Sequence, residues 1–545
     1  MPSEADGAAV LAADEAPEHA AARRAARAAF AFFDAGRGSP AFMENAGGSQ
    51  VPRCVADAVR DHLLYDCAQL EAGHEVSTRS TAKVQAAHDT MTAFFGAAGA
   101  GHVALGASSS QLLAALASCY ARLLGPGDEV VVQEACHEAN AGPWVRCAEG
   151  SGAALKWWRT DVTPEFAGAD GAAGGAGSSN GGAPLGPPLR VSFPCASRLP
   201  QLRSLLSHRT RLVAVTHVSN LLGGVADVPA LVELVREAAP RARLVVDGVA
   251  YAPHLAVDAA GWGVDWYVVS IYKTFGPHLA ALYGSAAAFQ ELAAARGPNH
   301  YFIHPSAPSY WFELGGASHE ACAGVVAIGG YLRLLAAAKG GAAKGGAAAG
   351  GDGAADGAGE AAAAPLSRGV VEAAFGLMSD LEATLAAPII DLLQAHPRVI
   401  LIGPGAAPGG GGRHGGDAGW SGRVPTISFV HIEKSSRDVA REVQARGFAI
   451  RSGHAYAHRL VRALAPAVLP HLRRTPVAPA PGGAAAGGAA AAQSGATAAQ
   501  SGAAAPAADA AAAAFVEDGV VRISLLHYNT PGEVAGLVAA LREVL

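Results

Sequence analysis

The stretch 244–284 contains two short apolar runs, each followed by a polar side chain that could reach out of a sheet. The first run, 244–246, leads into Asp247, and the second, 266–269, leads into a segment that contains Lys273. Short runs rich in valine and aromatic residues predict β-strands. In open parallel sheets, ligands bind at the carboxyl ends of the strands, so we expect this carboxylate and this amine to face one site.

A carboxylate and a lysine delivered in this way fit the needs of pyridoxal phosphate (PLP). The PLP aldehyde forms a Schiff base with an amine, and a lysine serves well where its surroundings disfavour the ammonium form. An anion beside the pyridine nitrogen raises the nitrogen's pKa by about 1 to 3 units, which keeps the ring protonated and electron-withdrawing. Lys273 and Asp247 are therefore the candidates for these two positions.

Four segments carry a resemblance to a known family: VDGVAYAPH, DWYVVSIYKTFGPH, SNLLGG and VRISLLHYNT. They resemble the class V aminotransferases and, within these, the cysteine desulfurase-like proteins. The resemblance extends from about Phe42 to the C-terminus. It implies PLP as the cofactor, a homodimer, and the fold type I architecture of PLP-dependent aminotransferases.

Helical and strand patterns alternate along the chain, which independently predicts an α/β fold with a mostly parallel sheet. Helices are expected at 82–95, 111–124, 228–239 and 321–337, and strands at 129–133, 212–217, 244–246 and 266–269. We expect an N-terminal segment packed near the small domain, a large PLP-binding domain, a low-complexity linker and a smaller α+β C-terminal domain, at residues 1–55, 56–337, 338–366 and 367–545.

Four stretches consist almost entirely of small residues and proline: 168–188, 338–364, 403–422 and 478–514. Because they offer few large apolar side chains, they cannot offset the entropy lost on ordering. We predict that they are mobile surface insertions.

The phosphate of the cofactor has several candidate ligands. The segment LGASSSQL at 105–112 precedes a helical pattern, and from the residues alone an ordinary helix cap is the simpler interpretation of its serines. The resembled family holds the phosphate at this turn, which assigns Ser109 and Ser110 to it. Ser270 and Tyr272, which stand beside Lys273, are expected to bind the phosphate as well.

Two further positions gain a role only through the resemblance. A histidine after a strand is more often a plain polar residue, but His137 matches the family histidine that stacks on the pyridine ring. Asn220 matches an asparagine close to the phenolic oxygen of PLP and the substrate carboxylate. Cys136 has no neighbour in the sequence that would lower its pKa, so we interpret it as a small core residue.

Two arginines in the C-terminal part are expected to bind the substrate. Arg522 lies in the strand pattern 520–528, where burying a guanidinium is costly unless an anion pairs with it. The resemblance assigns Arg522 to the α-carboxylate of an amino-acid substrate and places Arg451 in a substrate-binding loop. A plain structural salt bridge is the alternative for Arg522.

The chain departs from the family pattern at several positions. Ala250 replaces a glutamine or histidine, Tyr272 a histidine, and Gly316 a threonine that reaches the neighbouring subunit's cofactor. Most importantly, Tyr456 in the loop RSGHAY stands where cysteine desulfurases carry the cysteine that receives sulfur. A phenol cannot carry a persulfide.

These residues predict a PLP-dependent enzyme that acts at the α-carbon of an amino acid, with Lys273 as the base. Three hypotheses follow. The first is a cysteine desulfurase- or lyase-like enzyme that uses free thiols or water as acceptor. The second is an epimerase, racemase or aminotransferase, and the third is a PLP-binding protein whose catalysis has decayed, suggested by Ala250 and Gly316.

Composition excludes several other classes. The net charge is −6 and no basic cluster occurs, so nucleic acid is not an expected partner. The seven cysteines form no CxxC pair, which disfavours a zinc site or disulfide framework. No uninterrupted apolar run predicts a membrane span, and the N-terminus does not resemble a secretory signal. We expect a cytoplasmic protein and leave an organelle transit peptide open.

Overall fold

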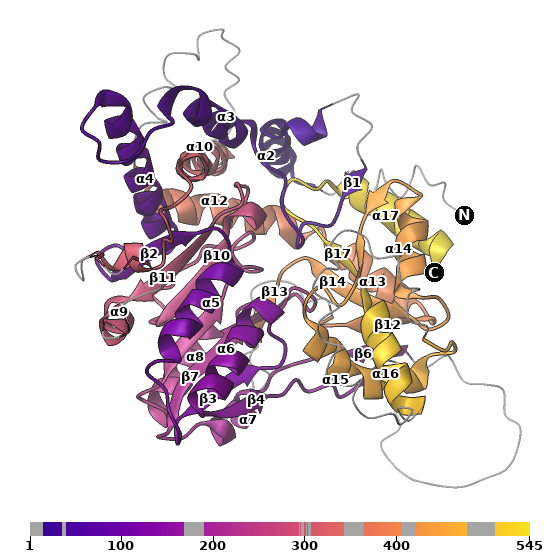
Figure 1. Cartoon of the computed structure of the whole chain (residues 1–545). Coiled ribbons are helices and arrows are strands. Elements are labelled where there is room, and N and C mark those ends of the chain that lie inside the picture. The colour runs from indigo at the N-terminus through magenta and orange to yellow at the C-terminus, as the bar shows by residue number, and fades with distance from the viewer. Residues whose placement is uncertain are drawn as a thin grey trace, which may run out of the picture.

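The computed structural model describes the protein at residues 15–34, 40–167, 190–293, 295, 299–300, 302–303, 307–342, 365–405, 420–476 and 507–545. These residues form two sheets with their own helical layers, one in the middle of the chain and one mainly towards the C-terminus (Figure 1).

The larger sheet has seven strands in the order β2-β11-β10-β9-β7-β3-β4. All neighbours pair in parallel except β11, which is antiparallel to both β10 and β2. The strands are β2 (Gly101–Gly106), β3 (Glu129–Gln133), β4 (Ala154–Trp158), β7 (Thr210–Thr216), β9 (Arg243–Asp247), β10 (Trp266–Ser270) and β11 (Ala280–Ser285). The predicted α/β fold is confirmed, and all four predicted strands lie in this sheet.

Helices cover both faces of this sheet (Figure 1). Consecutive strand residues alternate between two hydrophobic cores, as Val245 and Val246 do, because side chains along a strand point to opposite faces. Burial on both sides explains the nearly continuous apolar runs. One core contains side chains of α5 (Ser109–Tyr120) and α6 (Glu138–Ser151); the other contains those of α4 (Glu75–Phe94), α8 (Val228–Ala238) and α10 (His319–Ala342).

The smaller sheet has six strands in the order β16-β17-β14-β12-β6-β5, antiparallel except for the β12–β6 pair. Its strands are β5 (Glu165–Ala167), β6 (Arg190–Phe193), β12 (Val399–Ile402), β14 (Thr426–His431), β16 (Arg451–Gly453) and β17 (Val520–Ser524). One core holds α13 (Ala387–Ala395), α14 (Ser436–Gln444) and α17 (Pro531–Val544); the other holds α15 (His458–Val468) and α16 (Ala507–Asp518).

The boundary between the two parts differs from the expected one at two places. Strands β5 and β6 come from the predicted large domain, yet β6 pairs with β12 in the smaller sheet. Helix α12 (Arg368–Ala383), expected in the small domain, packs against α10 and α4, because its apolar side chains enter the core of the larger sheet.

The N-terminal part of the chain contacts both halves. Helices α2 (Pro17–Ala28) and α3 (Arg53–Asp61) both pack against α10. Strand β1 (Ala41–Phe42) pairs in parallel with β15 (Phe448–Ala449).

Most of the four predicted insertions lie outside the described residues, but three of them enter regular structure at their edges. Helix α10 continues to Ala342, β13 (Trp420–Arg423) pairs with β8 (Gly224–Ala226), and α16 begins at Ala507. The expected loops are therefore helix or strand at these edges. Alanine is the strongest helix former, which explains why an alanine-rich run can extend a helix.

Two helical segments among the described residues could cross a membrane by length and composition alone, His319–Lys339 and Arg368–Ala395. In each, 56% of the apolar window is buried inside the protein, a property that core helices share.

Candidate active site

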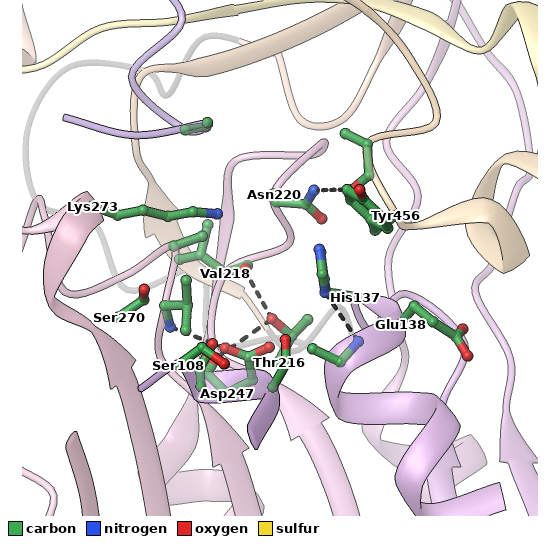
Figure 2. A pocket seen from close by; sticks show the side chains of 18 of the residues that line it. Ser108, His137, Glu138, Thr216, Val218, Asn220, Asp247, Ser270, Lys273 and Tyr456 are labelled. Atoms are coloured by element: carbon green, nitrogen blue, oxygen red, sulfur yellow. Dashed lines mark hydrogen bonds between the residues drawn. The ribbon is translucent and has the colours of Figure 1, made fainter. Parts of the chain in front are cut away.

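The predicted lysine and carboxylate lie in one cavity, at the carboxyl ends of adjacent strands. Asp247 is the last residue of β9, and Lys273 ends a 3₁₀ turn, η3 (Ile271–Lys273), that follows β10 directly. Both line a cavity of about 520 Å³. The amino group of Lys273 points into this cavity, with Asp247 at its floor (Figure 2).

Burial controls the charge of Asp247. It raises the pKa of this carboxyl to about 6. Two smaller effects lower the pKa: the Val249 N–H donates to Asp247 Oδ1 at 3.0 Å, and the charge of Lys273 attracts the carboxylate. These two interactions do not offset the cost of burying the carboxylate charge, so a cation that binds beside Asp247 stabilises its ionised form. A protonated pyridine nitrogen is such a cation.

Burial and the nearby Arg522 lower the pKa of Lys273 to about 8, from an ordinary value of 10.5. The opposing attractions of Asp247 and Glu44 are smaller. A large fraction of this amine is therefore unprotonated near pH 8, as required for attack on an aldehyde.

The amino end of α5 forms a possible phosphate seat. Ser108 is the N-cap, and its hydroxyl accepts the Gln111 N–H at 3.1 Å. Ser109 and Ser110 are the first helical residues, and all three serines line the cavity. The first-turn N–H groups and the helix dipole favour a phosphate here. The sequence interpretation missed Ser108, although a serine preceding a helical pattern is an N-cap signal.

Ser270 and Tyr272 also line the cavity. The hydroxyl of Tyr272 donates to the Gly47 carbonyl at 2.6 Å, so its proton is already engaged. A phosphate role for Tyr272 stays a prediction.

His137 is the N-cap of α6, where its Nδ1 accepts the Ala139 N–H at 3.0 Å. Burial, followed by the charges of Lys273 and Arg522, lowers the pKa of His137 to about 3. The imidazole is therefore neutral at physiological pH. With Nδ1 accepting, the ring proton lies on Nε2, and an uncharged aromatic face is available for stacking.

Asn220 reaches the cavity from the loop after β7 (Figure 2). Its side-chain amide donates to the Ala455 carbonyl at 2.7 Å. Its Oδ1 is buried and has no hydrogen-bond partner among the described residues. Because a buried polar atom without a partner is costly, Oδ1 is an acceptor suited to a ligand.

The two arginines also line the cavity, and they share one carboxylate. Arg522 donates from Nη1 to the Asn220 carbonyl at 3.1 Å and from Nη2 to Glu44 Oε1 at 2.9 Å. Arg451 donates from Nη1 to the same Oε1 at 3.3 Å. The salt bridge considered for Arg522 is thus present. However, the buried Nε of Arg522 has no acceptor in the described part of the chain.

The loop that carries Tyr456 has an unusual backbone. Ala455 and Tyr456 have φ angles of 44° and 62°, in the left-handed region that costs non-glycine residues about 1 to 3 kcal/mol each. Asn220 holds the Ala455 carbonyl, and the Glu138 N–H donates to the Tyr456 carbonyl at 2.8 Å. The Tyr456 ring lies 5.3 Å from the His137 ring.

The other departures from the family pattern fall in different places. Ala250 lines the cavity, whereas Gly316 is not among its lining residues. All seven cysteines lie in the described residues, and none of them lines the cavity. Burial raises the pKa of the Cys136 thiol well above its usual value, in keeping with a core residue.

The arrangement fits PLP on several independent observations. The cavity volume is in the range typical of cofactor sites. A buried acid, a lysine of lowered pKa, a helix amino end with three serines and the free acceptor of Asn220 all face it. Lys273 and Asp247 would hold the aldehyde and ring nitrogen, and the serines of α5 the phosphate.

The raised pKa of Asp247 leads to a stability prediction for the cofactor-free protein. Native Asp247 binds its proton more tightly than the unfolded residue, whose pKa is near 3.8, so its contribution to stability falls as pH rises from about 4 to 6. Above pH 6 the full cost of about 2–3 kcal/mol is present. Asp247→Asn should therefore unfold at higher urea than the parent at pH 7.5, with a smaller difference at pH 4.5. Equal differences at both pH values would contradict this origin.

The chain is similar to known proteins of one family. The family model described as aminotransferase class-V matches residues 41–167 and 196–347. An aminotransferase-like protein of Gibberella zeae, FGM3, is 30% identical over 509 residues, which cover 92% of this chain and 94% of that protein. A cysteine desulfurase-like protein of Aspergillus flavus, ustD, is 33% identical over 218 residues, 40% of this chain and 43% of its own.

Solved structures agree on the fold. The crystal structure of the cysteine desulfurase CsdA from Escherichia coli superposes with a TM-score of 0.59 at 18% identity. The superposition covers 95% of this chain and 97% of that one. A likeness at this identity shows the architecture, a fold type I arrangement of a large and a small part.

Proposed function

Because this chain belongs to the class V aminotransferase family and is a PLP-dependent enzyme, we propose that it acts at the α-carbon of an amino acid, with Lys273 as the base. One observation carries the proposal: the buried Asp247 and the half-buried Lys273 line a single cavity, and their pKa values are shifted to about 6 and about 8 respectively. Such opposed shifts of two titratable groups in one cleft are typical of catalytic sites.

Each residue of the site has a task in this proposal. Bound PLP supplies an electron sink that makes the α-proton of an attached amino acid acidic. Lys273 accepts this proton, since burial keeps a large fraction of its amine neutral. Asp247 would stabilise positive charge at the ring nitrogen, and Arg522, which lines the cavity, would bind the α-carboxylate. His137, which also lines the cavity, would cover one face of the ring.

The absence of a cysteine from the described cavity lining bears on the reaction type. Tyr456 occupies the loop position of the sulfur-accepting cysteine and cannot take up sulfur. We therefore propose a cysteine desulfurase- or lyase-like reaction that needs no persulfide on the protein. Sulfur, if cysteine is the substrate, would pass to a free thiol or leave as sulfide.

An amino-acid epimerase is the second candidate, favoured by one observation. Tyr456 and Lys273 lie on opposite sides of the cavity (Figure 2). Inversion of an α-carbon needs a proton acceptor on one face and a donor on the other, and a phenol across from the lysine could be that donor. Membership of an enzyme family leaves the third hypothesis, a decayed PLP-binding protein, without support.

A panel of L-amino acids in deuterated water tests the proposal. We expect incorporation of deuterium at the α-carbon of at least one member, measured by proton NMR. Sulfide release from cysteine marks the desulfurase-like outcome, and loss of chirality with exchange marks epimerisation. Failure of every amino acid to exchange, with PLP bound, would refute the α-carbon function.

We also propose a homodimer, in line with the family. Three consecutive hydrophobic residues at the end of the α3 region, Leu63, Leu64 and Tyr65, are 53%, 62% and 69% exposed. Adjacent exposed apolar side chains commonly mark an interface.

A further inference from the structure

Glu44 lies between two arginines that face each other across a strand pair. Arg451 of β16 and Arg522 of β17 are direct cross-strand partners. Like charges directly opposite each other in an antiparallel pair are destabilising. Glu44 Oε1 accepts hydrogen bonds from both guanidinium groups, at 3.3 Å and 2.9 Å, so one carboxylate compensates the pair.

The chain holds this carboxylate firmly in position. The backbone of Glu44 bridges to Ser524, two residues beyond Arg522 on β17. Gly47 leaves the space that the carboxylate occupies, since a Cβ at this position would lie 2.1 Å from Glu44 Oε1. Both backbone and side chain of Glu44 are therefore fixed by local structure.

The pairing of Glu44 with Arg451 and Arg522 limits how many anionic groups of a substrate can bind beside these two arginines. Two guanidinium charges face one carboxylate there, so a single positive charge is left for an incoming anion. Arg522 lines the cavity, so this remaining charge is available to the α-carboxylate while Nη2 stays on Glu44.

Apart from Lys273, which the proposed function assigns to the cofactor and the α-proton, a second anionic group would meet no unmatched cation near these arginines. On the α6 side, the carboxylate of Glu138 pairs with Arg459 and lies 3.6 Å from His458. Arg146, a further cation in the lining, lies near that carboxylate, because Arg146 Nη1 and Glu138 Oε1 are 3.3 Å and 2.4 Å from the point where a Cβ on Gly142 would stand.

We infer that Glu44 is a specificity-determining residue that restricts the site to amino acids with one carboxylate, and that it disfavours acidic side chains. The inference rests on the proposed function, because it assigns the remaining charge of Arg522 to the α-carboxylate. Glu44 itself positions Arg522 and balances charge, and takes no part in proton transfer.

Paired amino acids of equal shape test this inference. The dissociation constants of glutamine and glutamate, and of asparagine and aspartate, are measured on the PLP-loaded protein from changes in the cofactor's visible absorbance. We expect the parent to prefer each amide over its acid, and Glu44→Gln to shift the ratio towards the acid by about tenfold or more. Glu44→Asp keeps the charge and should retain most of the preference.

A second readout needs no reaction at the cofactor. Succinate and its monoamide lack an amine, and calorimetry measures their dissociation constants. In Glu44→Gln the ratio of these two constants should shift towards the acid, as it does for the amino acids. Gly47→Ala, which displaces the carboxylate without removing it, should shift the ratio in the same direction. Glu237→Gln removes one exposed carboxylate, paired with Arg203 far from the cavity, and should leave both ratios unchanged.

The outcomes separate the inference from the proposed function. Acid-to-amide ratios that stay within twofold of the parent in Glu44→Gln would overturn the role of Glu44 while the α-carbon function stands. If no amino acid alters the absorbance of either protein, the proposed function fails and the inference fails with it.

Discussion

Replacing Lys273 with alanine should lower the rate of α-proton exchange by about 10⁴-fold or more. The residue combines covalent attachment of the cofactor with general base catalysis, and base catalysis alone is worth about 10²–10⁴-fold. No other lysine lines the described cavity to replace it. The measurement is deuterium incorporation into the substrate found by the amino-acid panel, with PLP supplied in excess.

A matched control separates this loss from general damage. Lys339→Ala removes a partly exposed lysine of α10, whose amine lies 3.5 Å from Asp380, and should leave exchange unchanged. Exchange within tenfold of the parent in Lys273→Ala would show that another group removes the proton.

Replacing Arg522 with leucine should lower kcat/KM for the amino-acid substrate by about 10²–10³-fold, which corresponds to about 3–4 kcal/mol. Arg522 is buried, and burial lowers its pKa only to about 10, so it carries its charge at neutral pH. Charge-assisted hydrogen bonds to a carboxylate are among the strongest polar contacts. Steady-state kinetics of both proteins give the ratio directly.

The decarboxylated analogue of the same substrate provides the control for Arg522→Leu. An amine without the α-carboxylate cannot use the guanidinium, so parent and variant should bind it equally. An equal loss for the amino acid and for its amine analogue would assign Arg522 a purely structural role, as in its salt bridge with Glu44.

The pair at the centre of the site could be predicted from sequence because its signals are local. Asp247 directly follows one apolar run and Lys273 stands four residues after the other, and parallel strands bring their carboxyl ends to one edge of the sheet. The phosphate seat at Ser109 and Ser110 came from the family resemblance, because the residues alone favoured an ordinary helix cap, and the cap itself is Ser108.

Contacts between distant segments could not be predicted in this way. Glu44 and Arg522 are separated by 478 residues, and no periodic pattern reports their contact. Strands β5 and β6 precede β7 in the chain yet join the smaller sheet, because the pairing of β6 with β12 depends on tertiary contacts that the local sequence does not indicate. The alanine-rich composition that suggested a loop before residue 514 is equally compatible with helix α16, which packs against α15.

The central claim is that PLP binds in this cavity and is attached to Lys273. It is tested most directly by borohydride reduction of the PLP-loaded protein followed by peptide mass mapping. We expect the reduced cofactor on Lys273 in the parent and in Asp247→Asn. Cofactor mass on a different lysine, or on no peptide at all, would contradict the account.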